Sequence, residues 1–196
     1  MNSQITQIDY QIIKMLNYFD NKNEQNIDWN GLKSDINTLY TSWNSVIIDF
    51  SVLDIDNNDL TDFGKKIDAI MITVQNRDIN KAKSNLSDLY GFLVQYTNCY
   101  QSNIILKNNI TTKYYLIKAY ILLDTNNWTL VNENINNATM NFYQNINIVE
   151  IAENQKFNLN KTYVAINELK NTLANKNKEL FYIKYKIAME EIEKIK

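Results

Sequence analysis

The feature that most limits the fold of this chain is its shortage of turn-forming residues. It contains no proline and only three glycines, Gly31, Gly64 and Gly91, among 196 residues. A β-rich or α/β protein of this size needs many tight turns, and proline and glycine supply a large share of them. We therefore expect an all-α protein.

The apolar residues repeat with the period of an α-helix. Between residues 28 and 50 they are spaced three and four positions apart, which places them on one helical face. They are Trp29, Leu32, Ile36, Leu39, Trp43, Val46 and Phe50. The segments 4–20, 59–76 and 78–104 show the same spacing. Each of these segments is predicted to be an amphipathic helix.

Short polar residues precede several of these helices. Asp28 stands before Trp29, Asn58 or Asp59 before the third helix, and Asp78 before the fourth. Their side-chain oxygens can accept hydrogen bonds from the exposed N–H groups of a first helical turn. Short capped breaks of this kind are typical of antiparallel helices joined by tight loops.

The second half of the chain resembles the first. YYLIKAYILLD, residues 114–124, matches YQIIKMLNYFD, residues 10–20, at a shift of 104 positions. At a shift of 99, Trp29 falls on Trp128 and Trp43 on Phe142, and the last two helices match best at a shift of 96. The drift between these shifts is what changes in loop length produce. We interpret the pattern as an internal duplication.

The predicted fold is an all-α, internally duplicated antiparallel helical bundle of about eight helices, elongated and rather rigid. The first bundle repeat covers residues 1–106 and the second covers 107–196. The second repeat is expected to contain helices at 109–124, 127–149, 157–173 and 175–195. We expect a bend near Asn108 and Asn109, with a continuous helix across the junction as the alternative.

The composition argues against most catalysis. The chain has no histidine, which excludes Ser-His-Asp triads, Cys-His pairs and histidine-based metal sites. Its one cysteine, Cys99, is expected to be a buried or half-buried structural thiol. The formal charge is −2 with both signs interspersed, so no basic stripe is offered to nucleic acid. We expect no enzyme, no cofactor and no nucleic-acid partner.

One segment concentrates acidic residues around an inter-helix loop. It contains Asp49, Asp54, Asp56, Asp59 and Asp62. As a calcium loop beginning at Asp54, it has Asp59 where glycine is needed and Lys65 where a bidentate glutamate is needed. A solvated helix-capping loop is the favoured interpretation, and a cation site is the alternative.

Aromatic residues supply the candidates for a binding surface. The chain has 13 tyrosines and three tryptophans. Tyr40, Tyr115 and Tyr143 lie off the apolar stripes, where a ring is available for a ligand or a partner. Trp29 and Trp128 begin the repeated second helix. These five residues are the predicted ligand or partner surface.

Four sequence patterns are similar to an uncharacterised group of helical lipoproteins from low-GC Gram-positive bacteria. They are DW-x13-W ending at Trp43, F-x3-I-x2-I from Phe63, NKAKSNLSDLYGFLVQY from Asn80, and NNW-x13-F ending at Phe142. The resemblance covers nearly the whole chain. It implies a protein tethered by lipid on an N-terminal cysteine to the outer face of the cell membrane. We expect membrane attachment only through such an anchor, located outside these 196 residues.

Two functional hypotheses from different classes follow. The first is a non-catalytic envelope lipoprotein that acts as a structural or protein-interaction module, with another envelope protein as its partner. The second is a helical module that binds a small ligand or a cation. A large exposed apolar patch favours the first, and a concave pocket with convergent polar groups favours the second.

Overall fold

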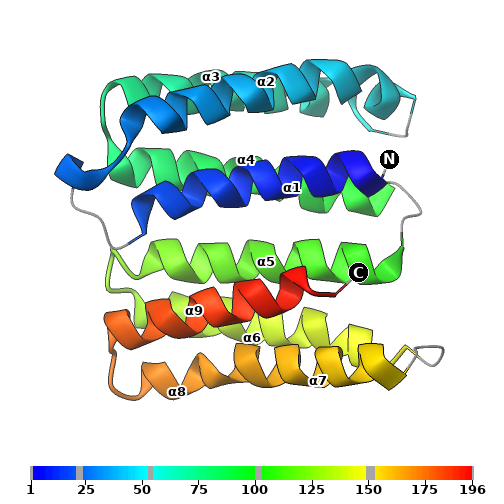
Figure 1. The fold of residues 1–196 in the computed structure, drawn as a ribbon, viewed down its shortest axis with the longest axis vertical. Helices are drawn as coiled ribbons and strands as arrows, with labels where there is room; N and C mark the ends of the chain where they lie inside the picture. Colours follow the sequence, from blue (N-terminus) through cyan, green and yellow to red (C-terminus); the bar gives the residue numbers. More distant parts are fainter. Residues whose placement is uncertain (1, 21–23, 53–54, 100–102, 149–152, 196) are drawn as a thin grey trace. The chain divides into compact units, whose positions relative to one another are not determined.

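The computed structural model describes residues 2–20, 24–52, 55–99, 103–148 and 153–195. In these residues the chain consists of helices joined by short loops, and no strand occurs in them (Figure 1). The prediction of an all-α helical bundle is confirmed. The chain divides into two compact units, Met1–Ser102 and Asn103–Lys196. The sequence had placed this boundary between Leu106 and Lys107.

Unit 1 is a four-helix bundle. Its long helices are α1 (Asn2–Leu16), α2 (Trp29–Ser51), α3 (Asn57–Gln75) and α4 (Ile79–Cys99), and the short 3₁₀ helices Asn17–Phe19 and Glu24–Asn26 follow α1. Successive long helices run antiparallel, and α1 packs on both α2 and α4, which closes the bundle (Figure 1). The apolar stripe of α2 predicted from the sequence is buried along its whole length.

Unit 2 has the same order of helices. Its elements are α5 (Ile104–Leu122), α6 (Trp128–Ile146), α7 (Glu153–Glu168), α8 (Lys170–Leu173) and α9 (Lys178–Glu193). The short α8 follows α7 after a break at Leu169, so the pair occupies the place of α3. As in unit 1, the first long helix packs on the second and the last, α6 and α9.

Buried positions correspond between the two units. The buried residues of α1 recur in α5 at a shift of 104, as in Ile12 and Leu116. The other helices correspond at a shift of 99, which pairs Leu86 with Tyr185, both buried. The shift of 96 predicted for the last two helices of each repeat is wrong, because it pairs the buried Leu86 with Tyr182, which is half-buried.

The turns before α4 and α9 share one backbone geometry. Arg77 has a φ of 55°, and the N–H of Asp78 donates to the carbonyl of Thr73 at 3.0 Å. Lys176 has a φ of 48°, and the N–H of Asn177 donates at 3.4 Å to the carbonyl five residues earlier. Both are left-handed helix terminations of the Schellman type, here made without glycine. The local chain path is therefore repeated along with the core.

Helix caps agree in part with the prediction. Asp28 caps α2 and accepts from the N–H of Gly31 at 2.9 Å. The cap of α3 is Asp56, which accepts from the N–H of Asn58 at 2.8 Å, so the expectation of Asn58 or Asp59 is wrong. The helix begins earlier than expected, because the Asp56 carboxylate accepts a hydrogen bond from a backbone N–H of its first turn.

The predicted bend at Asn108 and Asn109 is also wrong. Both residues are buried inside α5, which is continuous from Ile104 to Leu122. A helix running on from α4 is excluded as well, because Asn103 has a ψ of 119° and caps α5 through its side chain. Asparagine is more common in turns than inside helices, but these two side chains bond across the core to Asn145, which accounts for their place inside α5.

Candidate functional site

A groove of about 300 Å³ lies along unit 1 between α1 and α2. Its walls are one edge of α1 and the facing edge of α2, and it is called the α1/α2 groove below. The residues that line it are Gln7, Tyr10, Gln11, Lys14, Asp35 and Thr38. The lining residues are spaced three and four positions apart on α1 and three apart on α2, so on each helix they lie along one edge.

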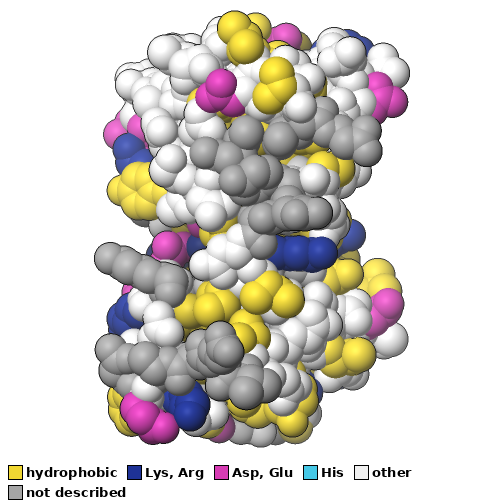
Figure 2. Space-filling view, turned by 90° about the vertical axis from the view of Figure 1, so that its right-hand side faces the viewer, with side chains coloured by type: hydrophobic (Ala, Val, Ile, Leu, Met, Phe, Trp, Pro, Cys, Tyr) yellow, Lys and Arg dark blue, Asp and Glu magenta, His cyan; other side chains and the backbone are white. Residues whose placement is uncertain are grey.

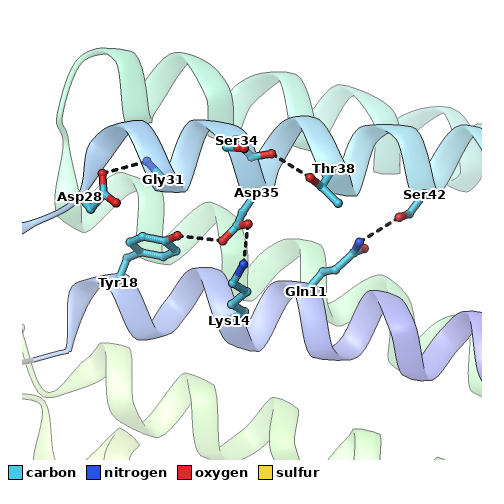
Figure 3. Close-up of polar contacts among 9 residues, drawn as sticks. All are labelled: Gln11, Lys14, Tyr18, Asp28, Gly31, Ser34, Asp35, Thr38 and Ser42. Carbon is cyan, nitrogen blue, oxygen red and sulfur yellow. Dashed lines mark hydrogen bonds and ion pairs between the residues drawn. The ribbon is translucent and has the colours of Figure 1, made fainter.

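A fixed ion pair lies in the α1/α2 groove. The Nζ atom of Lys14 is 2.7 Å from Oδ1 of Asp35, and the hydroxyl of Tyr18 donates to Oδ2 of Asp35 at 3.0 Å (Figure 3). The hydrogen bond to Asp35 raises the pKa of the Lys14 ammonium above its usual value. Burial, followed by the bond to Asp35, raises the pKa of Tyr18. Charged Lys14 and neutral Tyr18 together hold the carboxylate in place.

Amide groups form another part of the groove. The Nε2 atoms of Gln11 and Gln7 donate to the hydroxyl of Ser42 at 2.9 and 3.3 Å (Figure 3 shows the first of these bonds). The Oε1 atom of Gln11 is buried and has no hydrogen-bond partner among the described residues. The Tyr10 side chain is 62% exposed. The groove thus combines an exposed ring, amides and a neutralised ion pair.

The residues predicted to form a binding surface in unit 1 have different roles. Trp29 is buried, and its ring meets that of Phe19 edge-on at a centroid distance of 6.1 Å. It belongs to the core at the start of α2, where sequence reasoning had treated it as a candidate for contact. Tyr40 lies on α2 with 41% of its surface exposed. It is not among the residues that line the α1/α2 groove.

The predicted residues of unit 2 lie on different helix surfaces. Tyr115 contacts its neighbour Tyr114 on α5, with ring centroids 5.5 Å apart. Tyr143 of α6 contacts Tyr163 of α7 at 5.6 Å. Trp128 is half-buried at the first position of α6. The structure therefore distributes these rings over two units and several helices.

In the acidic segment, one aspartate caps a helix and another forms an ion pair. Asp56 caps α3, and Asp62 forms an ion pair with Lys65 at 2.8 Å. Asp54 lies outside the described residues. Within the described part of the chain, no group of three or more Asp, Glu, Cys or His side chains is placed to hold a metal ion.

The expectation of a buried thiol at Cys99 is wrong. Cys99 is the last residue of α4 and is exposed. The buried side of α4 ends at Thr97, so the stripe that covers the core stops before the cysteine.

Sequence reasoning missed an apolar surface on α9. Three residues at a spacing of three and four positions face outward, and they are Leu180, Ile183 and Ile187, with exposed fractions of 37%, 49% and 47%. We call them the α9 strip. Their counterparts in unit 1, at a shift of 99, are the exposed polar residues Lys81, Ser84 and Asp88. The correct register between the repeats would have revealed this difference from the sequence.

The surface carries charges of both signs. On the face shown in Figure 2, Lys, Arg, Asp and Glu side chains are scattered among uncharged ones, and hydrophobic side chains are more frequent on unit 2, drawn in the lower half. Next to the α9 strip, Lys184 and Glu168 form an ion pair that ties α9 to α7. The hydrogen bonds from Lys184 and Asn171 lower the pKa of Glu168. The strip thus lies beside a charged, ordered border.

Comparisons of the chain with known protein families, with curated proteins and with solved structures gave no match. No helix in the described residues combines the length and the apolar character needed to cross a membrane. The resemblance to helical lipoproteins stays a prediction from the sequence patterns. The α9 strip and the α1/α2 groove are the structural candidates for a functional site.

Proposed function

We propose that this protein is a non-catalytic module of the bacterial cell envelope, attached to the membrane by a lipid anchor, that binds another envelope protein. The sequence similarity to helical lipoproteins supports the location. The observation that carries the binding role is the α9 strip, in which Leu180, Ile183 and Ile187 are exposed on one helical face.

The comparison between the units supports a binding role for the strip. The α4 helix of unit 1 occupies the same place in its bundle and has Lys81, Ser84 and Asp88 at the corresponding positions. The bundle therefore does not need apolar residues there. Isolated exposed apolar residues are common, but an aligned set on one face is typical of a contact surface.

The shape and charge of the strip indicate the kind of partner. A stripe with helical spacing is complementary to the apolar face of an amphipathic helix. Glu179 and Glu190 border the strip, because they lie four positions before Ile183 and three positions after Ile187, and both are exposed. The proposed partner is an amphipathic helix with basic residues opposite Glu179 and Glu190.

The binding role is tested with a matched pair of variants. Ile183→Glu/Ile187→Glu places charges on the strip, and Ser84→Glu/Asp88→Glu places acidic groups at the same positions of α4. Partners cross-linked to the wild-type protein in intact cells are identified and purified, and each affinity is measured by calorimetry. We expect the α9 variant to bind at least about tenfold more weakly, a loss of about 1.4 kcal/mol, and the α4 variant to bind as the wild type does.

Two results would overturn this proposal. One is an unchanged affinity of the α9 variant, provided that its far-ultraviolet circular dichroism matches that of the wild type. The other is the location of the protein. An envelope protein is expected in the membrane fraction and is digested when protease is added to intact cells. Recovery of the protein from the cytosol, protected from protease, contradicts the envelope role.

A further inference from the structure

We propose that the α1/α2 groove of unit 1 is a binding site for a neutral saccharide. This site is separate from the α9 strip and adds a ligand to the proposed protein-binding role. The lining of the groove supplies each of the three kinds of contact that a sugar ring requires: an aromatic surface, hydrogen-bonding amides, and a donor next to an acceptor.

The ion pair selects for a neutral ligand. Lys14 and Asp35 are 2.7 Å apart, so any group that enters the groove meets both charges at once. An anion is attracted by the ammonium and repelled by the carboxylate, and a cation is attracted by the carboxylate and repelled by the ammonium. A hydroxyl group accepts from Lys14 and donates to Asp35, because it has both an O–H and lone pairs. Neighbouring hydroxyls on a sugar ring match this arrangement.

The amides add an acceptor that lacks a donor. The Nε2 atom of Gln11 is used by Ser42, while its Oε1 atom has no partner among the described residues. A buried acceptor without a donor costs free energy, and a rotation of the Gln11 side chain that brings this oxygen to a ligand hydroxyl removes the cost. The side-chain hydroxyl of Thr38, on the facing helix, donates to the carbonyl of Ser34 at 3.0 Å and keeps lone pairs for a further bond.

The exposed ring of Tyr10 supplies the apolar surface. It is 62% exposed although it belongs to the lining of the groove. The C–H groups on one face of a sugar ring form an apolar surface that packs on an aromatic ring, and its covering is favourable. The volume of about 300 Å³ is at the lower end of the range for small-molecule sites, which suits one or two sugar rings.

The same edge of unit 2 has different chemistry. The counterpart of Asp35 is Asn134, whose Nδ2 donates to the backbone of its own helix at 2.8 Å. The counterpart of Lys14 is Lys118, whose Nζ lies 5.0 Å from the centre of the Tyr114 ring. The charged pair of unit 1 is therefore not a requirement of the repeated fold, and unit 2 serves as an internal control.

The test is a titration of the ¹⁵N-labelled full chain with neutral sugars, followed by NMR. The probes are glucose, N-acetylglucosamine and its β-1,4-linked disaccharide, with glucuronate and glucosamine as charged comparisons. We expect shifts confined to residues 7–14 and 35–38, with a dissociation constant of about 1 mM for the best neutral probe, near −4 kcal/mol. The charged sugars are expected to bind at least about fivefold more weakly, about 1 kcal/mol.

Variants separate a built site from general surface contact. Tyr10→Ala and Asp35→Asn should each weaken binding at least about fivefold, whereas Tyr114→Ala, the matched change in unit 2, should leave it unchanged. If Asp35→Asn does not fold, Gln11→Leu replaces it. The α9 variant Ile183→Glu/Ile187→Glu should bind sugar normally, so failure here is distinguishable from failure of the protein-binding role. Absence of shifts at about 100 mM neutral sugar, or equal binding by Tyr10→Ala, overturns the assignment.

Discussion

The first helix pairs of the two units place their polar contacts at opposite depths. In α1 and α2 the contacts are at the solvent edge, where Lys14 pairs with Asp35. In α5 and α6 they are in the core, where Asn145 accepts from Asn108 at 2.7 Å and donates to Asn109 at 2.9 Å. All three asparagines are buried. One arrangement of helices therefore accommodates polar side chains either at its edge or in its centre.

The cores of the two units also differ in composition. The counterparts of Asn109 and Asn145 in unit 1 are Ile5 and Val46, both buried. Unit 1 fills its core with an aromatic cluster in which each ring lies within 6.2 Å of at least one other, and its members are Trp43, Phe50, Phe63, Phe92 and Tyr96. The pattern of burial is shared, but unit 1 relies on ring packing where unit 2 uses buried amides.

Removing the central ring of the aromatic cluster should have the largest effect. Trp43 is buried, and its ring centroid lies 4.1 Å from that of Phe63. Trp43→Ala removes this packing and leaves a cavity, so we expect a loss of about 3–5 kcal/mol in the free energy of unfolding. Urea titration measures the loss. Tyr40→Ala, on the exposed side of the same helix, is the control and should change stability by less than about 0.5 kcal/mol. Equal losses would contradict the assignment of the core.

Breaking the amide network should have a smaller effect. Asn145→Ala leaves Asn108 and Asn109 buried without their shared partner. Each buried amide that loses its hydrogen bond carries a desolvation cost, so we expect a loss of about 1–3 kcal/mol. The measurement is again the free energy of unfolding from urea titration. A loss below about 0.5 kcal/mol would mean that water or other groups satisfy the two asparagines.

Replacing the whole network tests whether unit 2 can adopt the chemistry of unit 1. The variant Asn108→Leu/Asn109→Ile/Asn145→Val removes every member and inserts apolar side chains. Since no amide remains unsatisfied, we expect a stability within about 1 kcal/mol of the wild type and above that of Asn145→Ala. A triple variant less stable than the single one shows that the site fits amides specifically, and thermal denaturation of the three proteins decides between these outcomes.

Removing the ion pair between Lys14 and Asp35 should have the smallest effect on stability, and this effect should be visible at alkaline pH. The folded-state pKa values of Lys14 and Tyr18 are raised above their usual 10.5 and 10.0. A group with a raised pKa stabilises the fold fully below its unfolded pKa, and this contribution is lost as the pH rises through the folded value. We expect the melting temperature to fall above about pH 10. Asp35→Asn, which copies the asparagine of unit 2, should flatten this part of the profile.

The control for the alkaline profile is Asp62→Asn, which removes the exposed ion pair between Asp62 and Lys65. Both side chains of that pair are exposed, where solvent screens their interaction, so the profile of this variant should follow that of the wild type. If Asp35→Asn and Asp62→Asn give the same profile, the ion pair between Lys14 and Asp35 contributes nothing specific to stability.

The sequence was sufficient for the helices and for most of the core. The spacing of Leu32, Ile36 and Leu39 predicted a buried face on α2, and all three are buried. The predicted register between α4 and α9 was wrong for a physical reason. In α9 the outward positions Ile183 and Ile187 are apolar as well, so a pattern based on hydrophobicity matches almost equally well when it slips by three residues.

The candidate sites were harder to predict from the sequence. Tyr10 and Lys14 match Tyr114 and Lys118 between the repeats, but this match does not predict that they line a groove. Asp35, the partner of Lys14, is 21 positions away from it in the chain. The α9 strip was also missed, because with the wrong register its residues were not compared with the polar residues of α4.

What the sequence determined by itself is the helical character, the start of α2 at a capping aspartate and the face of each helix that is buried. These properties depend on residues within a few turns of one another. The tertiary structure decided which polar groups meet: Asn145 with two residues of α5, and Asp35 with Lys14 and Tyr18. Such pairs depend on how far one helix slides and rotates against the next, which is set by the packing of whole faces and is not encoded in any single stretch of the chain.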